Sequence, residues 1–308
     1  MKKAWQRQIR DKMAKKEPRE IATLDGAEVR EITYAEAASV ILKYEWLGNM
    51  GTTGKAYGLF IKEELAGVVC FGRTNGTNVV SSVAGEKWKD NVIILCRGAC
   101  VHWAPPHAAS FLINKACNSM AQPEGWIDSE GNTRPPANIV VAYSDSDAGE
   151  IGTVYQASNW LYCLQTATST VGKKKGQHKA KAKDMMSLIR LKVRDRSGRK
   201  GPDGEGKYYF ERGGKKYFLG DTLPDGKPVV GKGPYIYIQK MTRAEAIKAL
   251  EKEGYIFTSG NAKHRYVGIF GDKRTRRAIR KDLKWPVGEY PKRADDSQGK
   301  PLAPPAVG

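Results

Sequence analysis

The stretch NVIILCRGACVHWAPPHAASFLINKACNSM, residues 91–120, passes from an apolar segment through small residues into a second apolar segment. Residues 91–97 predict a short buried strand, and residues 108–120 have the apolar spacing of a helix. Pro105 and Pro106 stand just ahead of that helix, where proline is well tolerated. A strand followed at once by a helix is typical of a sheet with helices packed on its faces.

The segments on either side of this stretch continue the pattern. Thr33 and Glu36 form a capping box at the start of a predicted helix. Residues 62–64 form a tight charged turn between two predicted strands. The elements predicted around residues 91–120 are a helix at 34–42, strands at 57–61, 65–72 and 138–143, and a helix at 152–164. This order predicts an α/β or α+β domain over residues 1–165, with a mixed central sheet flanked by helices.

The composition changes after Leu164. Residues 166–240 are rich in Lys, Gly and aromatic residues, which predicts a basic insertion built from short hairpins. Residues 241–293 contain an amphipathic helix, two candidate strands and a very basic helix, and we expect them to complete the first domain. Residues 294–308 predict a flexible, proline-containing extension.

The positive charge is confined to one half of the chain. Residues 1–160 contain 18 Lys+Arg and 18 Asp+Glu, whereas residues 161–308 contain 34 and 15, which accounts for the whole net charge of +19. Such asymmetry predicts a polyanionic partner, a class that includes double-stranded DNA, although a solvated lysine-rich surface is the simpler alternative. The lysine run and the basic helix supply the expected phosphate contacts, which are Lys173, Lys174, Lys175, Arg276, Arg277 and Arg280.

The sequence predicts a cytoplasmic protein, in the cytoplasm of the host cell if a phage encodes it. No run of about 18 apolar residues occurs, and the basic first residues lack the apolar stretch of a secretory signal. The five cysteines are an odd set without a CxxC pair and predict reduced core residues. Cys96, Cys100 and His102 are conceivable metal ligands, but no second cluster completes a tetrahedral site, so no metal is expected.

Two stretches contain the side chains expected to do chemistry. After the strand that ends at Arg97 and Gly98, the helix start at Ala108, Ala109 and Ser110 can hold the phosphates of a nucleotide cofactor. The second stretch, AYSDSDAGEIGTVYQASNW at residues 142–160, places carboxylates just past a strand, where α/β sheets gather their sites. On a helix starting at Gly152, Tyr155 and Asn159 would share one face. The structural alternative is a capped helix with surface carboxylates.

The second stretch resembles the Mom family of phage proteins. Residues 143–160 are similar to the family pattern of an aromatic, a small residue and Asp, followed by Gly-Thr-Ile-Tyr-Gln-Ala-Ser/Thr-Asn. Residues 44–48, 57–72 and 97–110 match in the same order, and residues 263–267 and 290–293 resemble the closing segment of the family. The resemblance covers most of residues 30–165 and resumes near 255–293. It extends the expected DNA contacts to Lys263, Arg265 and Tyr266.

The resemblance implies an acetyltransferase-like (GNAT) fold that converts adenine in DNA to its N6-carbamoylmethyl derivative and so protects DNA from restriction. It implies acetyl-CoA or a related acyl donor as cofactor, and a proton-donating role for Tyr155. Because the exocyclic amine of adenine is a poor nucleophile, we expect Asp145, or Glu45 as a second candidate, to act as general base or to orient the base, with Asn159 beside them. Base flipping is expected, with Tyr44, Trp46 or Trp160 as stacking surfaces.

Two other classes of function are consistent with parts of the sequence. A non-enzymatic DNA-binding protein would explain the basic half equally well, but it would gain nothing from carboxylates near an anionic ligand. An acetyltransferase that acts on a protein or a small molecule would explain the first half, but it would rarely need the basic one.

Overall fold

The computed structural model describes residues 4–72, 77–128, 131–168, 170–174, 183–260 and 262–292. The chain divides into two compact units, each described here by itself. Unit 1 contains residues 1–167 and 261–308, and unit 2 contains residues 168–260. Residues 241–260, which the sequence assigned to the first domain, therefore group with the inserted unit. The predicted extension at 294–308 lies outside the described residues.

Unit 1 is built on a seven-stranded sheet with the order β1-β2-β3-β4-β7-β18-β8. The pair β4 and β7 is parallel, and the other neighbours are antiparallel. Unit 2 is inserted in the sequence between β8 and β18, which are neighbouring strands of the sheet. The strands are β1 (Glu28–Glu31), β2 (Lys55–Ile61), β3 (Glu64–Gly72), β4 (Val92–Cys100), β7 (Ile139–Asp145), β8 (Leu161–Gln165) and β18 (Lys263–Ile269), with a separate hairpin of β5 (Trp126–Ile127) and β6 (Thr133–Arg134).

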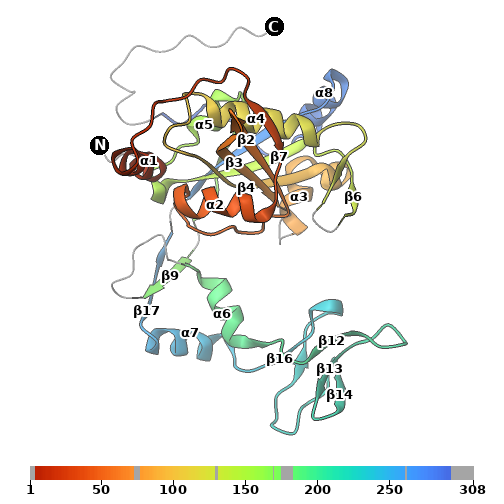
Figure 1. Ribbon diagram of the computed structural model, residues 1–308. Helices are drawn as coiled ribbons and strands as arrows, with labels where there is room; N and C mark the ends of the chain where they lie inside the picture. The colour runs from red at the N-terminus through yellow and green to blue at the C-terminus, as the bar shows by residue number, and fades with distance from the viewer. Residues whose placement is uncertain are drawn as a thin grey trace. The chain divides into compact units, whose positions relative to one another are not determined.

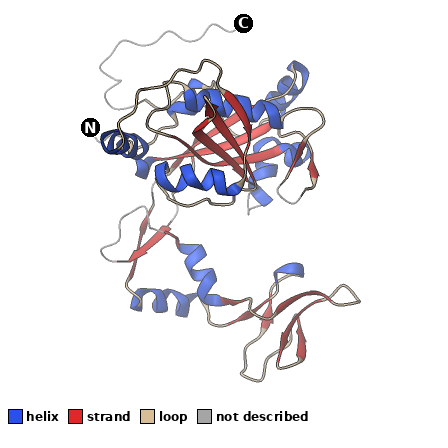
Figure 2. Cartoon of the chain, in the orientation of Figure 1, coloured by secondary structure: helices blue, strands red, loops and turns tan. Residues whose placement is uncertain are grey.

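Helices cover both faces of this sheet (Figures 1 and 2). In Figure 1, α4 and α5 lie above the sheet and α2 and α3 lie below it. The helices are α1 (Trp5–Lys16), α2 (Tyr34–Tyr44), α3 (Thr77–Ala84), α4 (Ala108–Met120), α5 (Thr153–Ala157) and α8 (Lys273–Asp282), with 3-10 turns η1 (Glu86–Asn91) and η2 (Ser146–Ala148). The predicted class, a mixed central sheet flanked by helices, is confirmed.

The alternation of side chains along β7 explains why helices pack on both faces of the sheet. Val140 and Ala142 belong to the larger apolar core, which includes Leu112 of α4. Ile139 and Val141 point the other way and join a second core with Val83 of α3 and Ile279 of α8. Because side chains alternate in a strand, an uninterrupted apolar run such as this one fits a strand that is buried on both faces.

The helix predicted at 152–164 is wrong beyond Ala157. α5 ends there, Asn159 adopts a left-handed conformation with φ of 55°, and residues 161–165 form β8. Tyr162 and Leu161 pair with Tyr266 and Val267 of β18, so a tertiary contact outweighs local helical spacing. The capping box at Thr33 is confirmed, with Thr33 Oγ1 accepting from the Glu36 amide.

Unit 2 contains two small cores. In the first, α6 (Met185–Val193) and α7 (Arg243–Lys252) pack together, beside a sheet of β9 (Thr170–Lys174), β10 (Lys183–Asp184) and β17 (Tyr255–Ser259). The second core lies between two three-stranded sheets. Their strands are β11 (Arg194–Asp195), β15 (Val229–Val230) and β16 (Tyr237–Gln239), and β12 (Arg199–Pro202), β13 (Tyr208–Arg212) and β14 (Lys215–Phe218), with the turn η4 (Gly233–Tyr235) nearby.

Candidate active site

The parallel strands β4 and β7 separate at their carboxyl ends. Their pairing begins at Val92 with Ile139 and stops at Leu95 with Ala142. β4 continues to Cys100 along β3, and β7 continues to Asp145 along β18. The central sheet therefore opens between residues 96–100 and residues 143–145. The carboxyl ends of strands are where α/β sheets place ligands, which makes this opening the candidate site.

A β-bulge marks the point of separation. Arg97 pairs with Cys70 and Leu95 pairs with Phe71, so Cys96 has no partner on β3. The Cys96 thiol donates to the Cys70 carbonyl at 3.3 Å and lies 3.7 Å from the hydroxyl of Thr53. Because an extra residue bends the strand that contains it, the bulge accounts for the departure of β4 from β7.

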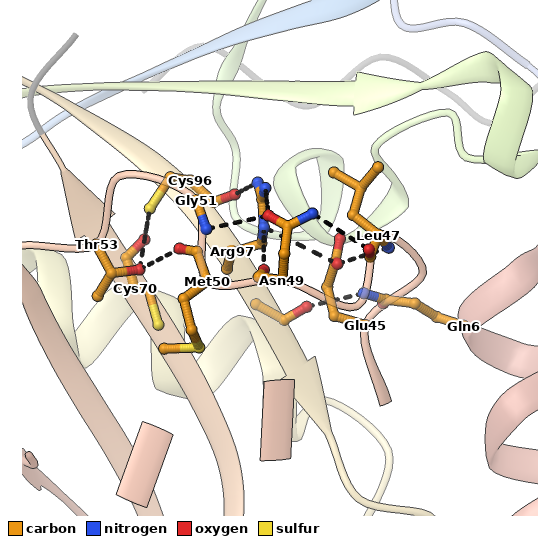
Figure 3. A network of polar contacts seen from close by, with 11 residues as sticks. Gln6, Glu45, Leu47, Asn49, Met50, Gly51, Thr53, Cys70, Cys96 and Arg97 are labelled. Atoms are coloured by element: carbon orange, nitrogen blue, oxygen red, sulfur yellow. Dashed lines mark hydrogen bonds and ion pairs between the residues drawn. The ribbon is translucent and has the colours of Figure 1, made fainter. Parts of the chain in front are cut away.

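Glu45 and Arg97 meet beside the bulge (Figure 3). Glu45 ends α2 and is buried, with 7% of its side chain exposed, and its carboxylate lies 4.0 Å from Arg97 Nε. Arg97 Nε donates to the Asn49 carbonyl at 2.7 Å, and a terminal nitrogen donates to Asn49 Oδ1 at 2.6 Å. The loop after α2 is thus fastened to β4 by one guanidinium.

Burial raises the pKa of Glu45. Arg97 and the amides of Leu47 and Gly48, one of which donates to the carboxylate at 2.7 Å, oppose this shift, and the charge of Asp145 adds to it. A carboxyl group whose pKa is raised toward neutrality is suited to accept a proton from a weakly acidic group. Of the two carboxylates predicted as base candidates, Glu45 is the buried one.

Arg97 is not placed as the sequence predicted. Its nitrogens are used by Asn49 and by the Cys96 carbonyl, and a Cβ at Gly51 would lie 3.0 Å from the guanidinium carbon. These contacts show that the side chain holds the loop, and its contact with a cofactor phosphate stays a prediction. Gly98 lies within β4, not at its end, and its carbonyl accepts from Gln6 Nε2 of α1 at 2.8 Å.

Replacing Arg97 with Ala is expected to destabilise unit 1. Removing one partner of a buried charged pair leaves the other without compensation, and we expect a decrease of about 3 kcal/mol in the free energy of unfolding. Chemical denaturation followed by tryptophan fluorescence measures it. Arg97→Lys keeps the charge without the paired donors and should recover part of the stability. An unchanged denaturation midpoint in Arg97→Ala would show that the loop does not depend on this contact.

Asp145 stands at the end of β7 and is engaged on both carboxylate oxygens. One oxygen accepts from the amide of Asp147 at 2.9 Å, and the other lies 3.2 Å from Lys263 Nζ on β18. The ion pair also gives Lys263 a partner within the protein.

Tyr155 lies on the short helix α5 and is buried among aromatic rings. Its ring centroid is 5.1 Å from that of Trp160 and 5.2 Å from that of Tyr266. Burial raises the pKa of Tyr155 far above its ordinary value, and nearby groups that include Glu150 and Cys96 raise it further. The hydroxyl therefore keeps its proton, as a proton donor must.

The last described residues hold α5 in place. Gln156 Nε2 donates to the Tyr266 hydroxyl at 3.1 Å and to the Pro291 carbonyl at 3.3 Å. The Tyr290 hydroxyl donates to the carbonyl of Trp160 at 2.8 Å. These contacts explain why the motif at 143–160 is accompanied by a closing segment far away in the sequence.

Other predicted site residues lie elsewhere. Asn159 is exposed and left-handed, so it does not share a helical face with Tyr155. Ala108 to Ser110 form the first turn of α4, and no hydrogen bond joins them to Arg97 among the described residues. Of the proposed stacking residues, Tyr44 and Trp160 are buried and Trp46 is partly exposed.

The metal alternative finds no support in the contacts of its residues. Both ring nitrogens of His102 are engaged, one by the Tyr44 hydroxyl at 2.8 Å and the other by the Glu17 carbonyl at 2.7 Å. Burial raises the pKa of Cys100 to about 11, which disfavours the thiolate that binds metal. Within the described ranges, no three His, Cys, Asp or Glu side chains are grouped to hold a metal ion.

The residues expected to contact DNA fall into different environments. Tyr266 is fully buried and its hydroxyl donates to the Ile151 carbonyl, so its predicted contact with DNA is wrong. Arg265 lies 4.5 Å from the Trp285 ring, and Lys173 and Lys174 belong to β9 of unit 2. Lys175 lies outside the described residues. The exposed cations of α8 are Lys273, Arg274, Arg276, Arg277, Arg280 and Lys281.

Sequence reasoning missed several residues that shape the site. Asn49, Gln6 and Gln156 act through contacts with distant segments, which no local pattern reveals. The bulge at Cys96 likewise has no sequence signal, because it depends on how β4 pairs with β3. The only available sign was the glycine-rich loop around Asn49, which is typical of a segment near a ligand.

None of the described helices combines the length and apolar character needed to cross a membrane. Among solved structures, the chain is similar to an acetyltransferase of Bacillus subtilis in complex with CoA, at 10% sequence identity and a TM-score of 0.30, over 79% of this chain and 97% of that one. No curated protein matches the chain. The model of the Mom protein family matches residues 26–200, more than half of the chain, as the motif at 143–160 predicted. The chain belongs to the Mom protein family.

Proposed function

We propose that unit 1 is a transferase that modifies the exocyclic amine of adenine in DNA, giving the N6-carbamoylmethyl derivative that the family resemblance implies and protecting the DNA from restriction. One observation carries the proposal: a buried carboxyl with a raised pKa lies beside Arg97 at the opening between β4 and β7. Mass spectrometry of nucleosides from DNA of cells that express the chain tests it, with a modified deoxyadenosine as the expected product.

Glu45 is proposed to accept the proton from the adenine amine. That amine is weakly basic and weakly acidic, so it must lose a proton as it attacks. Arg97, 4.0 Å away, can stabilise the carboxylate until it takes the proton. Asp145, with its oxygens already engaged, is proposed to set the electrostatic environment of Glu45 and to hold Lys263.

Tyr155 is proposed to donate a proton to the leaving group. Its raised pKa keeps the hydroxyl protonated at neutral pH, and no hydrogen bond occupies this hydroxyl among the described residues. A group that gives up its proton only to a developing negative charge stabilises mainly the transition state. The packing of Trp160 and Tyr266 around the ring limits its rotation.

An acyl donor such as acetyl-CoA is the cofactor that the resemblance implies. The first turn of α4 fits its phosphates in part, because helix starts have unpaired amides and Ala108 and Ala109 have no long side chain to cover them. Arg97, expected to assist, is engaged elsewhere. Once bound, such a donor would supply a two-carbon unit, with coenzyme A leaving as the thiol; the amide nitrogen of a carbamoylmethyl group is not contained in acetyl-CoA and would have to come from a further nitrogen-containing reactant.

The buried carboxyl group of Glu45 favours an enzyme over a non-enzymatic DNA-binding protein. Burial of Glu45 costs stability, because the charged form loses hydration. A protein that only binds DNA gains nothing from that cost. The partly exposed Trp46, next to Glu45 in the chain, is the remaining candidate for stacking on a flipped adenine.

The exposed face of α8 is proposed to contact DNA phosphates. Its buried side is anchored by Ile279, and its own Asp282 is paired with Lys87 of another segment. Replacing Arg276, Arg277 and Arg280 with Ala should lower the slope of log affinity against log salt by about 0.9 for each phosphate that is no longer neutralised, because fewer counterions are released. Titration of a labelled duplex at several salt concentrations measures it.

A matched control is available on another helix of the same unit. Lys12, Lys15 and Lys16 are exposed on α1, and their replacement with Ala removes the same charge. The control should change the slope less than the α8 variant does. Equal slopes for the α8 variant and the unmodified protein would mean that α8 faces solvent in the complex.

A further inference from the structure

Two aromatic side chains of unit 2 lie outside its hydrophobic cores. On the hairpin of β13 and β14, Phe210 and Tyr217 point inward and are buried in one core. Tyr209 and Phe218 are register partners on the opposite face, with ring centroids 6.1 Å apart. Both are partly exposed, and neither belongs to a core cluster. These two rings are therefore not used to hold the fold together.

Cations without carboxylate partners lie beside this pair and on the neighbouring strand. Lys216 Nζ lies 4.6 Å from the Tyr209 ring and forms no ion pair with Glu211, its register partner on the same face. Lys200 on β12 is exposed and is likewise unpaired within the described residues. Some other cations of the unit are paired, as Arg212 is with Asp195 at 3.1 Å. We call Lys200, Tyr209, Lys216 and Phe218 the outer face of the hairpin.

The composition of the outer face indicates a particular kind of ligand. The solvent face of an antiparallel sheet is ordinarily polar, so exposed rings need another reason. Unit 2 contains 22 Lys+Arg and 10 Asp+Glu, which favours a polyanion over an apolar protein partner. Exposed rings beside unpaired cations are the arrangement that binds single-stranded nucleic acid, with bases stacking on the rings and phosphates near the cations. A duplex hides its base faces and cannot stack in this way.

We propose that the outer face of the β13–β14 hairpin is a stacking platform for the bases of single-stranded DNA. Tyr209 and Phe218 each offer a ring face to a base, and Lys216 and Lys200 attract the backbone. The inference concerns binding by unit 2 and does not depend on the reaction proposed for unit 1. Its ligand is any DNA segment whose bases are unpaired.

The test measures the affinity of the full-length protein for a fluorescein-labelled oligothymidylate by anisotropy. Tyr209→Ala and Phe218→Ala should each weaken binding about tenfold, because stacking on an aromatic side chain contributes to binding at each base. Tyr209→Leu keeps apolar bulk without a planar π-system and should weaken binding similarly. Tyr235→Ala removes another exposed tyrosine of the same unit, 63% accessible, and should leave affinity unchanged.

Three outcomes would overturn the proposal. One is unchanged affinity in Tyr209→Leu and Phe218→Ala, with circular dichroism showing folded proteins. A second is an equal decrease in Tyr235→Ala, which would make the effect nonspecific. The third is an equal decrease in affinity for a duplex of the same length, which would assign the face to duplex DNA. Because no turnover is measured, a failure of the proposed modification chemistry is separate from each of them.

Discussion

Replacing Tyr155 with Phe is expected to reduce DNA modification by about 100-fold or more, since general acid catalysis typically contributes that much. The substitution removes one oxygen atom and leaves the ring that packs on Trp160 and Tyr266. Folding and DNA affinity should therefore be nearly unchanged. The hydroxyl has no hydrogen-bond partner among the described residues, so its removal breaks no structural contact.

The amount of modified nucleoside formed by purified protein measures this effect. Tyr57→Phe is the matched control, because Tyr57 is also buried and burial also raises its pKa, but it lies on β2. The control variant should retain its activity. Wild-type yield from Tyr155→Phe would remove the proton donor from the mechanism.

Replacing Glu45 with Gln is expected to reduce modification by a similar factor, about 100-fold, because an amide cannot accept the proton. The same change should make the stability of the fold less dependent on pH. Burial raises the pKa of Glu45 in the folded state above its unfolded value, so the folded state binds more protons between the two pKa values. Stability then falls as pH rises through this window.

Glu45→Gln removes this decrease in stability with rising pH, because glutamine does not titrate. The melting temperature of the variant relative to that of the wild type should be higher at about pH 8 than at about pH 4, where both states of Glu45 are largely protonated. Thermal denaturation at the two pH values measures the difference. A difference in melting temperature between variant and wild type that is the same at both pH values would contradict the raised pKa of Glu45, whatever the activity of the variant.

Local sequence signals predicted much of unit 1. The apolar run at 139–142 and the capping box at Thr33 depend on neighbours in the chain, and the structure contains both elements. The helix predicted through Leu164 was wrong because pairing with β18, about 100 residues later, decides that segment. The boundary at 240 depended on composition, which does not show that β17 pairs with β9.

The site was predictable in its residue types but not in its geometry. Glu45, Asp145 and Tyr155 were chosen from their motifs, and their catalytic roles stay predictions; the structure places Glu45 4.0 Å from Arg97. The separation of β4 from β7 depends on the bulge at Cys96, a tertiary feature without a local pattern. The role of Arg97 differs because its partner Asn49 lies on a loop far away in the sequence.

The most direct test of the proposed chemistry is mass spectrometry of deoxynucleosides from DNA of cells that express the wild-type chain, Glu45→Gln or Tyr155→Phe, at matched protein levels. We expect a deoxyadenosine whose mass increase corresponds to a carbamoylmethyl group in the wild type, and only a trace of it in either variant. Unmodified deoxyadenosine in all three samples, or equal modification in all three, would contradict the proposed chemistry.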